Sequence, residues 1–204
     1  MKRGGFALFA LVIAPALAFG ALALLVLSVT TPSPAYAQTK PPIKIGFLTT
    51  LTGGQAAGGK EMEDGFRMAL EEVRGEVAGR KILLIVEDDE LKPDVGLTKT
   101  RKLIENDRVH LLAGVLHSGV SLAVGSYVAT KGTPLVVTNA IAKALTQEKR
   151  SPNIFRTSWA GGQAYFPFGP YVVGKLGYKR LILSYADYAA GQDMANGFAP
   201  YFKG

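Results

Sequence analysis

The stretch from residue 43 to residue 59, IKIGFLTTLTGGQAAGG, decides the fold. It opens with a short apolar run, passes through small polar residues and glycines, and leads into a segment with apolar residues at helical spacing. A strand, a glycine-rich loop and a helix in this order form the first half of a βαβ unit. The stretch therefore predicts an α/β fold built on a parallel sheet.

The same alternation of short apolar runs and longer helical segments continues along the chain. The predicted strands are residues 43–49, 82–86, 111–114, 135–137, 154–156 and 180–185. Apolar side chains recur at helical spacing in two intervening segments, with Met62, Phe66, Ala69, Leu70 and Val73 in the first and Val120, Ala123, Val124 and Tyr127 in the second. This pattern predicts a parallel sheet whose crossover helices cover both faces.

The residues at the helix ends refine these predictions. Asp94 is the predicted N-cap of a helix that runs to about Asn106, and Gly132 with Pro134 predicts a break after Lys131. A last helix is predicted from about residue 192 to residue 202. No closing segment follows it, so we expect the final part of the fold to be truncated.

Residues 1–37 differ in composition from the rest of the chain. Lys2 and Arg3 precede a run without charged side chains from residue 6 to residue 29, and an Ala-Tyr-Ala sequence ends at residue 37. This order is typical of a secretory leader that is cleaved before Gln38. A retained membrane anchor is the alternative, because the run reaches the roughly 20 residues that span a bilayer. Pro15 and the Ala-x-Ala site favour a removed leader.

The composition of the remaining 167 residues excludes several classes of function. Their net charge is +5, after Lys2 and Arg3 are subtracted from the +7 of the whole chain, and the basic residues are dispersed. Nucleic acid is therefore not an expected partner. The chain has no cysteine, which excludes disulfides, thiol catalysis, thiolate metal sites and a lipid-bearing N-terminal cysteine. We expect no cofactor and no metal.

Two loop motifs allow a catalytic or metal-binding interpretation and a simpler one. Residues 54–60, GQAAGGK, match the spacing of a phosphate-binding loop, but Glu61 replaces the hydroxyl residue that would hold magnesium. A tight turn with free backbone amides at a helix start explains the glycines better. Residues 87–90, EDDE, lack the spaced ligands of a calcium loop, so a solvated strand end is the favoured interpretation.

The dipeptide His117-Ser118 follows the third predicted strand. A histidine can activate a serine nucleophile, but residues adjacent in sequence rarely meet in that geometry, and the flanking residues do not form Gly-x-Ser-x-Gly. Ser118 is instead expected to be a helix N-cap, a ligand-binding residue or both. A helix N-terminus with a hydroxyl and free amides is a good site for a carboxylate.

In open parallel sheets, the loops that leave the carboxyl ends of the strands line the ligand crevice. Here these loops are residues 49–59, 115–119, 138–142 and 186–191, and they are rich in small residues. Tyr188 lies in the last loop, where its ring is placed to stack on a ligand. The other aromatic residues near it are expected to be mostly buried: Trp159, Tyr165, Phe166, Phe168 and Tyr171.

Three motifs in order resemble the type I periplasmic solute-binding proteins of ABC importers, in particular the branched-chain amino acid receptors. They are residues 43–53 (IKIGFLTTLTG), residues 86–89 (VEDD) with Pro93, and residues 153–157 (NIFRT). The resemblance covers nearly all of residues 43–204. It implies a two-lobed type I fold with residues 1–37 as signal peptide, residues 38–157 as ligand-binding lobe 1, and residues 158–204 as the start of an incomplete lobe 2.

The resemblance also implies positions for the ligand. The loop after the first strand contributes Thr52 and Gly53, and the loop after the third strand holds the ligand carboxylate at Ser118 and Gly119. The loop after the fourth strand contributes Ala140 and Ala142, and Tyr188 completes the predicted set. The family often has Thr or Ser where this chain has Ala142, and an aromatic residue where it has Gly58. These two departures weaken the case for an aliphatic amino acid. Residues 139–140 (NA) and 188–191 (YAAG) are more similar to relatives that take up aromatic carboxylates.

The implied function is capture of an amino acid or an aromatic or other small carboxylate in the periplasm, without catalysis. The expected partners are this solute and the permease subunits of an ABC importer, and the membrane is met only through the transporter. Two alternatives remain: a ligand-sensing domain of a receptor or regulator with the same fold, and a secreted hydrolase that uses Ser118.

Overall fold

The computed structural model describes residues 40–202, so the predicted leader and its cleavage site lie outside the described residues. The strands are β1 (Ile43–Thr49), β2 (Glu76–Val77), β3 (Arg80–Asp88), β4 (Leu111–Gly114), β5 (Leu135–Val137) and β6 (Ile154–Arg156). The helices are α2 (Ala56–Glu72), α3 (Pro93–Arg101), α4 (Ser118–Lys131), α5 (Phe168–Pro170) and α6 (Ala189–Phe202). Single helical turns cover Lys102–Asn106, Lys143–Thr146, Gln163–Tyr165 and Tyr171–Lys175.

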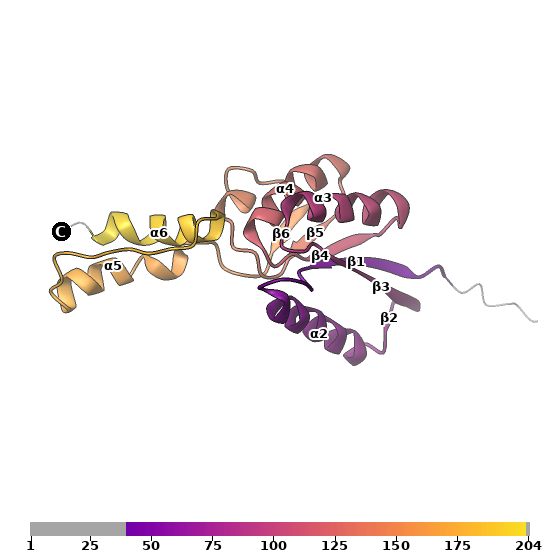
Figure 1. Cartoon of the computed structure of the whole chain (residues 1–204). Helices are drawn as coiled ribbons and strands as arrows, with labels where there is room; N and C mark the ends of the chain where they lie inside the picture. The colour runs from indigo at the N-terminus through magenta and orange to yellow at the C-terminus, as the bar shows by residue number, and fades with distance from the viewer. Residues whose placement is uncertain (1–39, 203–204) are drawn as a thin grey trace, which may run out of the picture. The chain divides into compact units, whose positions relative to one another are not determined.

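The six strands form one sheet in the order β2-β3-β1-β4-β5-β6. All neighbouring pairs are parallel except the short β2, which pairs antiparallel with β3. Helix α2 covers one face, and α3 with α4 covers the other (Figure 1). The predicted α/β fold with a mostly parallel sheet and helices on both faces is confirmed, and five of the six predicted strands are present.

The alternation of side chains along β1 explains why helices are needed on both faces. Ile45 and Phe47 point to the α2 face, where Met62 and Phe66 pack against them. The rings of Phe47 and Phe66 are 4.9 Å apart. Leu48 points to the opposite face. Because successive residues of a strand face opposite sides, an apolar run in a central strand has two faces to bury.

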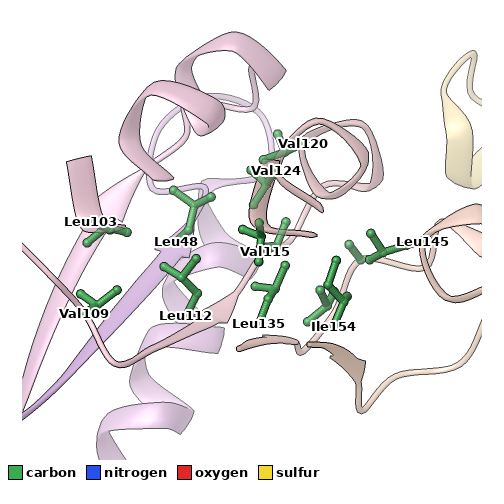
Figure 2. Close-up of a cluster of buried hydrophobic side chains, with 13 residues drawn as sticks. Leu48, Leu103, Val109, Leu112, Val115, Val120, Val124, Leu135, Leu145 and Ile154 are labelled. Carbon is green, nitrogen blue, oxygen red and sulfur yellow. The ribbon is translucent and has the colours of Figure 1, made fainter. Parts of the chain in front are cut away.

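The larger core lies between the sheet and the α3–α4 layer. Figure 2 shows its side chains converging from β1, β4, β5 and α4. Its members include Leu48, Leu103, Leu112, Val120, Val124, Leu135 and Ile154. Val120 and Val124 belong to the predicted apolar stripe of α4, which the structure therefore confirms.

The predicted strand at residues 180–185 is wrong. These residues are extended but pair with no strand of the described chain, and Ile182 is 96% exposed. An extended segment becomes a strand only where a neighbour completes its hydrogen bonds. The sequence pattern records the apolar residues but cannot supply the partner.

The helix boundaries confirm part of the predictions. The helix predicted after Asp94 is present as α3 and the following helical turn to Asn106, but its N-cap is Lys92. Pro93 takes the first helical position because it has no N–H to leave unpaired, which places Asp94 inside the first turn. Helix α4 ends at Lys131, as predicted, and Gly132 follows it in a left-handed conformation.

The predicted burial of the aromatic residues at positions 159–171 is also wrong. Trp159, Phe166, Phe168 and Tyr171 are between 42% and 59% exposed. Helix α5 packs against α6 and against the turns Gln163–Tyr165 and Tyr171–Lys175, which cover only part of these rings. Within residues 40–202, no helix has the length and apolar character needed to cross a bilayer.

Candidate functional site

The candidate site lies at the carboxyl ends of β1 and β4. These two strands are neighbours in the sheet, but α2 leaves β1 on one face and α4 leaves β4 on the other (Figure 1). The chain therefore diverges at this edge, which is the position where open α/β sheets bind ligands. All the predicted site residues belong to loops or helix starts that follow the sheet strands or precede α6.

Asp88, the last residue of β3, holds the loop that follows β1. Its Oδ1 atom accepts hydrogen bonds from the backbone amides of Leu51 (2.8 Å) and Glu90 (2.9 Å), and its Oδ2 atom accepts one from the Thr52 hydroxyl (2.8 Å). Burial acts to raise the pKa of Asp88, but these donors outweigh it and hold that pKa below its ordinary value. Thr52 and Gly53, both predicted site residues, are exposed on this loop, which the Asp88 carboxylate holds in place.

The buried carboxylate of Asp89 also holds the start of the loop that follows β1. Its Oδ1 atom accepts hydrogen bonds from the Thr50 hydroxyl (2.6 Å) and the Leu91 amide (2.9 Å). The residue is fully buried, and burial raises the pKa of its carboxyl, although the Thr50 and Leu91 hydrogen bonds act in the opposite direction.

The loop after β4 is built on unusual backbone geometry. Gly114 has a φ of +104°, and a Cβ atom there would lie 2.3 Å from the carbonyl oxygen of Leu48. The next residue, Val115, has a φ of 66°, which a β-branched residue rarely adopts. Its carbonyl oxygen accepts the Ala140 amide (3.0 Å), which ties the loop after β4 to the loop after β5. Such strain is often concentrated at functional sites.

Ser118 is the first residue of α4 and not its N-cap, which is His117. The residue is 2% exposed, and its Oγ atom accepts a hydrogen bond from the Ile141 amide (3.1 Å). Ser118 therefore lies directly beneath the loop that contains Ala140 and Ala142. Its hydroxyl hydrogen is not used by that bond and can be donated to an acceptor.

Three helices begin at this edge of the sheet, and none of them has a side-chain cap. The residues before α2, α3 and α4 make no capping hydrogen bond through their side chains. The first amides of a helix have no partner inside the helix and carry a partial positive charge. Pro93 at the start of α3 has no N–H, and the Ala56 amide of α2 donates to the Gly53 carbonyl oxygen (3.2 Å), but the remaining first amides form a group of donors suited to an anion.

Ala140 and Ala142 are both 1% exposed, and each has a backbone atom in a hydrogen bond. The Ala140 amide donates to Val115, and the Ala142 carbonyl oxygen accepts a hydrogen bond from the Arg156 guanidinium (2.8 Å). The loop between these alanines is thus packed closely against Ser118. The structure places both residues at the predicted edge and leaves the Ala142 amide at the start of the following helical turn.

Tyr188 and His117 face each other across this edge. Their rings are stacked, with centroids 4.8 Å apart and an angle of 13° between the ring planes. Gly119 makes room for the imidazole, since a Cβ atom at that position would lie 3.0 Å from its Cε1 atom. The dipeptide His117-Ser118 indicated no role for His117 other than that of a catalytic base. The one signal in the sequence for a different role was its position directly before a predicted helix start.

The structure gives no support to the catalytic alternatives. The Ser118 hydroxyl pairs with Ile141, and its neighbour His117 stacks on Tyr188, so no nucleophile and base pair forms between them. Lys60 pairs with Asp64 of its own helix (2.6 Å) and does not turn toward the loop at residues 50–55. Gly59 is required because a Cβ atom there would lie 1.6 Å from the Thr50 carbonyl oxygen.

The four acidic residues at positions 87–90 have structural roles of two kinds. Glu87 forms ion pairs with Lys99 (2.8 Å) and Lys102 (2.7 Å), while Glu90 pairs with Lys92 (2.9 Å). Asp88 and Asp89 hold the loop after β1. In the described part of the chain, no group of three or more residues is arranged to hold a metal ion.

Comparison with known proteins gives a consistent result. Residues 42–204 match the model of a protein family described as periplasmic binding protein. The Leu/Ile/Val-binding protein BraC3 of Rhizobium johnstonii is 29% identical over 158 residues, which cover 76% of this chain and 42% of the relative.

Solved structures show the same similarity. An ABC transporter substrate-binding protein from Sphaerobacter thermophilus is 42% identical with a TM-score of 0.71, covering 80% of this chain and 44% of that one. A solute binding protein of an ABC transporter from R. palustris, solved in complex with benzoate, is 34% identical with a TM-score of 0.74, covering 79% and 44%. The chain thus spans less than half the length of these relatives.

Proposed function

Because this chain belongs to the periplasmic binding protein family, we propose that it captures a small carboxylate-bearing solute at the carboxyl edge of its sheet and delivers it to the permease of an ABC importer. The observation that carries the proposal is the group of uncapped helix starts at that edge, beside the Ser118 hydroxyl. Amides and a hydroxyl bind a carboxylate without a metal or a charged side chain.

The predicted residues take distinct parts in this proposal. Ser118 and the first amides of α4, including that of Gly119, bind the carboxylate. Thr52 and Gly53 border it from the loop after β1, and the loop from Ala140 to Ala142 closes the opposite side. Tyr188 packs against the body of the solute. Since Ser118 is buried in this structure, the loop above it must shift when the solute binds.

The relatives fit two ligand classes. BraC3 is a Leu/Ile/Val-binding protein, and the R. palustris protein was solved with benzoate. Both ligands carry a carboxylate on an apolar body. We therefore propose an amino acid or an aromatic acid as the solute, and no chemical conversion of it.

Residues 158–202 are proposed to begin a second lobe that closes over the ligand. Their support is the exposed apolar side chains of the extended segment, which a larger lobe would bury, and the greater length of the relatives. Residues 1–37 are proposed to direct export to the periplasm and to be removed. N-terminal sequencing of the exported protein should then begin at Gln38.

Calorimetric titration of the full-length protein tests the function directly. Leucine, valine, benzoate and 4-hydroxybenzoate form the panel, and at least one of them should bind. Absence of binding across amino acids and aromatic acids would contradict the proposal.

Ser118→Ala should weaken binding by about tenfold or more, since a hydrogen bond to a charged group contributes about 1.5–3 kcal/mol. Ser126→Ala is the matched control, because Ser126 lies on the same helix with an exposed hydroxyl that bonds only to the Leu122 carbonyl oxygen. Equal affinities for the two variants would remove Ser118 from the site. Parallel unfolding measurements separate lost affinity from the lost Ile141 hydrogen bond.

A further inference from the structure

Within the described residues 40–202, one hydrogen bond joins helix α6 to residues 40–157. The Oδ2 atom of Asp193 accepts it from the backbone amide of Lys143 (2.7 Å). Asp193 lies in the second turn of α6, and Lys143 is the first residue of the helical turn Lys143–Thr146. The first amides of a helical turn have no partner inside the turn, and a hydrogen bond to a carboxylate is stronger than one between neutral groups.

The turn that donates this hydrogen bond is fixed to the sheet from its other side. Arg156, the last residue of β6, donates from its guanidinium to the Ala142 carbonyl oxygen (2.8 Å) and to the Thr146 hydroxyl (2.6 Å). The turn is therefore held at both of its ends by a strand of the sheet. A movement of α6 away from the sheet would break the Asp193 bond and leave the turn in place.

Glycines allow α6 to approach this turn closely. The Gly161 amide donates to the Ile141 carbonyl oxygen (2.7 Å). A Cβ atom on Gly161 would lie 2.5 Å from the Cβ atom of Asp193 and 3.0 Å from that carbonyl oxygen. A Cβ atom on Gly197 would lie 2.3 Å from the Cα atom of Gly162. The space between α6 and Ile141 thus fits only a glycine backbone, which brings Asp193 within reach of Lys143.

A cavity of about 280 Å³ lies beside the Asp193 hydrogen bond. Residues 40–157 contribute Lys143, Ala144 and Glu148 to its lining, and α6 contributes Asp193, Asn196 and Gly197. Because this space is not filled by packed side chains, few apolar contacts support the hydrogen bond there. The position of α6 on the turn therefore depends on Asp193 more than on apolar burial.

Resting on the proposed function, we propose that Asp193 is a positioning residue that keeps α6 docked on the turn at Lys143 and so keeps the solute enclosed. Tyr188 directly precedes α6 and reaches the candidate site, where its ring stacks on that of His117. Release of α6 from Lys143 withdraws Tyr188 from the solute, although Asp193 itself does not contact the solute. A solute that prefers the docked form binds more weakly when that form is less populated.

Two substitutions in the full-length protein remove the same hydrogen bond from opposite sides. Asp193→Ala removes the acceptor, and Lys143→Pro removes the donor N–H. Proline suits the first position of a helical turn, and Ala142 before it already has an extended ψ of 113°. Each variant should bind leucine or benzoate about tenfold more weakly, mainly through faster dissociation. The double variant should bind no more weakly than either single variant, because both changes remove one interaction.

Three control variants separate this hydrogen bond from other effects of the substitutions. Lys143→Ala keeps the N–H, and Asn196→Ala truncates a neighbouring side chain of the same cavity, so both should bind as the wild type does. Asp193→Asn keeps an acceptor oxygen and should recover part of the affinity that Asp193→Ala loses. Wild-type affinity in Asp193→Ala, additive losses in the double variant, or no recovery in Asp193→Asn would overturn the role of Asp193.

Distances between spin labels test the docking of α6 without a solute. Residues 1–204 contain no cysteine, so Ser126→Cys on α4 and Ala199→Cys on α6 introduce labels at two exposed positions of this part of the protein. Asp193→Ala should shift the distribution of label distances to longer values, whereas Asn196→Ala should leave it unchanged. Identical distributions in Asp193→Ala and in the protein with Asp193 would overturn the docking role.

The outcomes distinguish this inference from the proposed function. If the wild type binds none of leucine, valine, benzoate and 4-hydroxybenzoate, the proposed function fails, and the label distances still decide whether Asp193 docks α6. If the wild type binds a solute and both Asp193→Ala and Lys143→Pro bind it equally well, only the role of Asp193 fails.

Discussion

Residues 40–157 and residues 158–202 differ in how they bury their apolar side chains. Of the 23 buried hydrophobic residues, 18 lie in the first region, whereas 12 of the 17 exposed large hydrophobic residues lie in the second. All eight ion pairs between described residues also lie in the first region. The first region thus has a well-packed hydrophobic core, which can hold the residues of a site in place. The second has the composition of a core without its packing.

The largest expected effect is the difference in free energy of unfolding between two leucine-to-alanine variants, one in each region. Leu112→Ala in the first region should lower the free energy of unfolding by about 2–5 kcal/mol, because Leu112 is 1% exposed and packed on all sides. Leu181→Ala in the second region, at 44% exposure, should cost less than about 1 kcal/mol in this 204-residue chain. Denaturant unfolding measures both.

Measuring the same two variants in a protein with a complete second lobe extends this comparison. If that lobe buries the extended segment, Leu181→Ala should then approach the cost of Leu112→Ala. A small cost in the full-length protein as well would contradict the proposed second lobe.

Asp88→Ala comes next, with an expected loss of about 1–3 kcal/mol for the three donors that it leaves unpaired. The variant should also weaken solute binding, because the loop with Thr52 and Gly53 loses its anchor. Unfolding and titration are measured on the same sample. Unchanged affinity in a destabilised variant would show that this loop is not part of the site.

Two glycine substitutions should have opposite signs. Gly132→Ala should cost about 1 kcal/mol, since Gly132 has a φ of 71° at the end of α4 and alanine is strained there. Gly174→Ala in the second region should stabilise by about 0.5–1 kcal/mol, because Gly174 lies in a helical turn with open space around it. Thermal unfolding distinguishes the two, and a stabilising Gly132→Ala would contradict the left-handed helix end.

The smallest expected effect is the pH dependence of stability that Glu87 causes in the first region. Burial acts to raise the pKa of Glu87, but the hydrogen bonds and charges of Lys102 and Lys99 outweigh it and lower that pKa below 4.5. Its contribution to stability is therefore complete above pH 4.5 and is lost as the pH falls through the lowered value. Glu87→Gln should flatten this part of the stability profile. An unchanged acid slope would contradict the ion-pair account.

The sequence predicted the first region well because its local signals and its packing agree. In β1, alternating side chains meet helices on both faces, so the strand forms where its pattern predicts it. At residues 180–185 the same kind of pattern failed, because strand formation depends on a neighbour that lies outside the local sequence. Asp94 was displaced as N-cap by Pro93, which competes for the first helical position.

The sequence predicted only where the candidate site would lie, and that prediction remains untested by a bound ligand. Small residues after the strands indicated which edge of the sheet to consider, and the structure places Ser118, Gly119, Ala140 and Ala142 there. The sequence could not show that Ser118 is held by Ile141, or that His117 stacks on Tyr188. These contacts join residues 23 and 71 positions apart, which only the folded chain brings together.

The central claim is that uncapped helix starts and the Ser118 hydroxyl bind a carboxylate at the edge of the sheet. A crystal structure of the full-length protein with its bound solute tests this most directly. The account predicts carboxylate oxygens about 2.7–3.2 Å from the Ser118 hydroxyl or the first amides of α4. A solute bound elsewhere, with Ser118 still buried beneath Ile141, would contradict it.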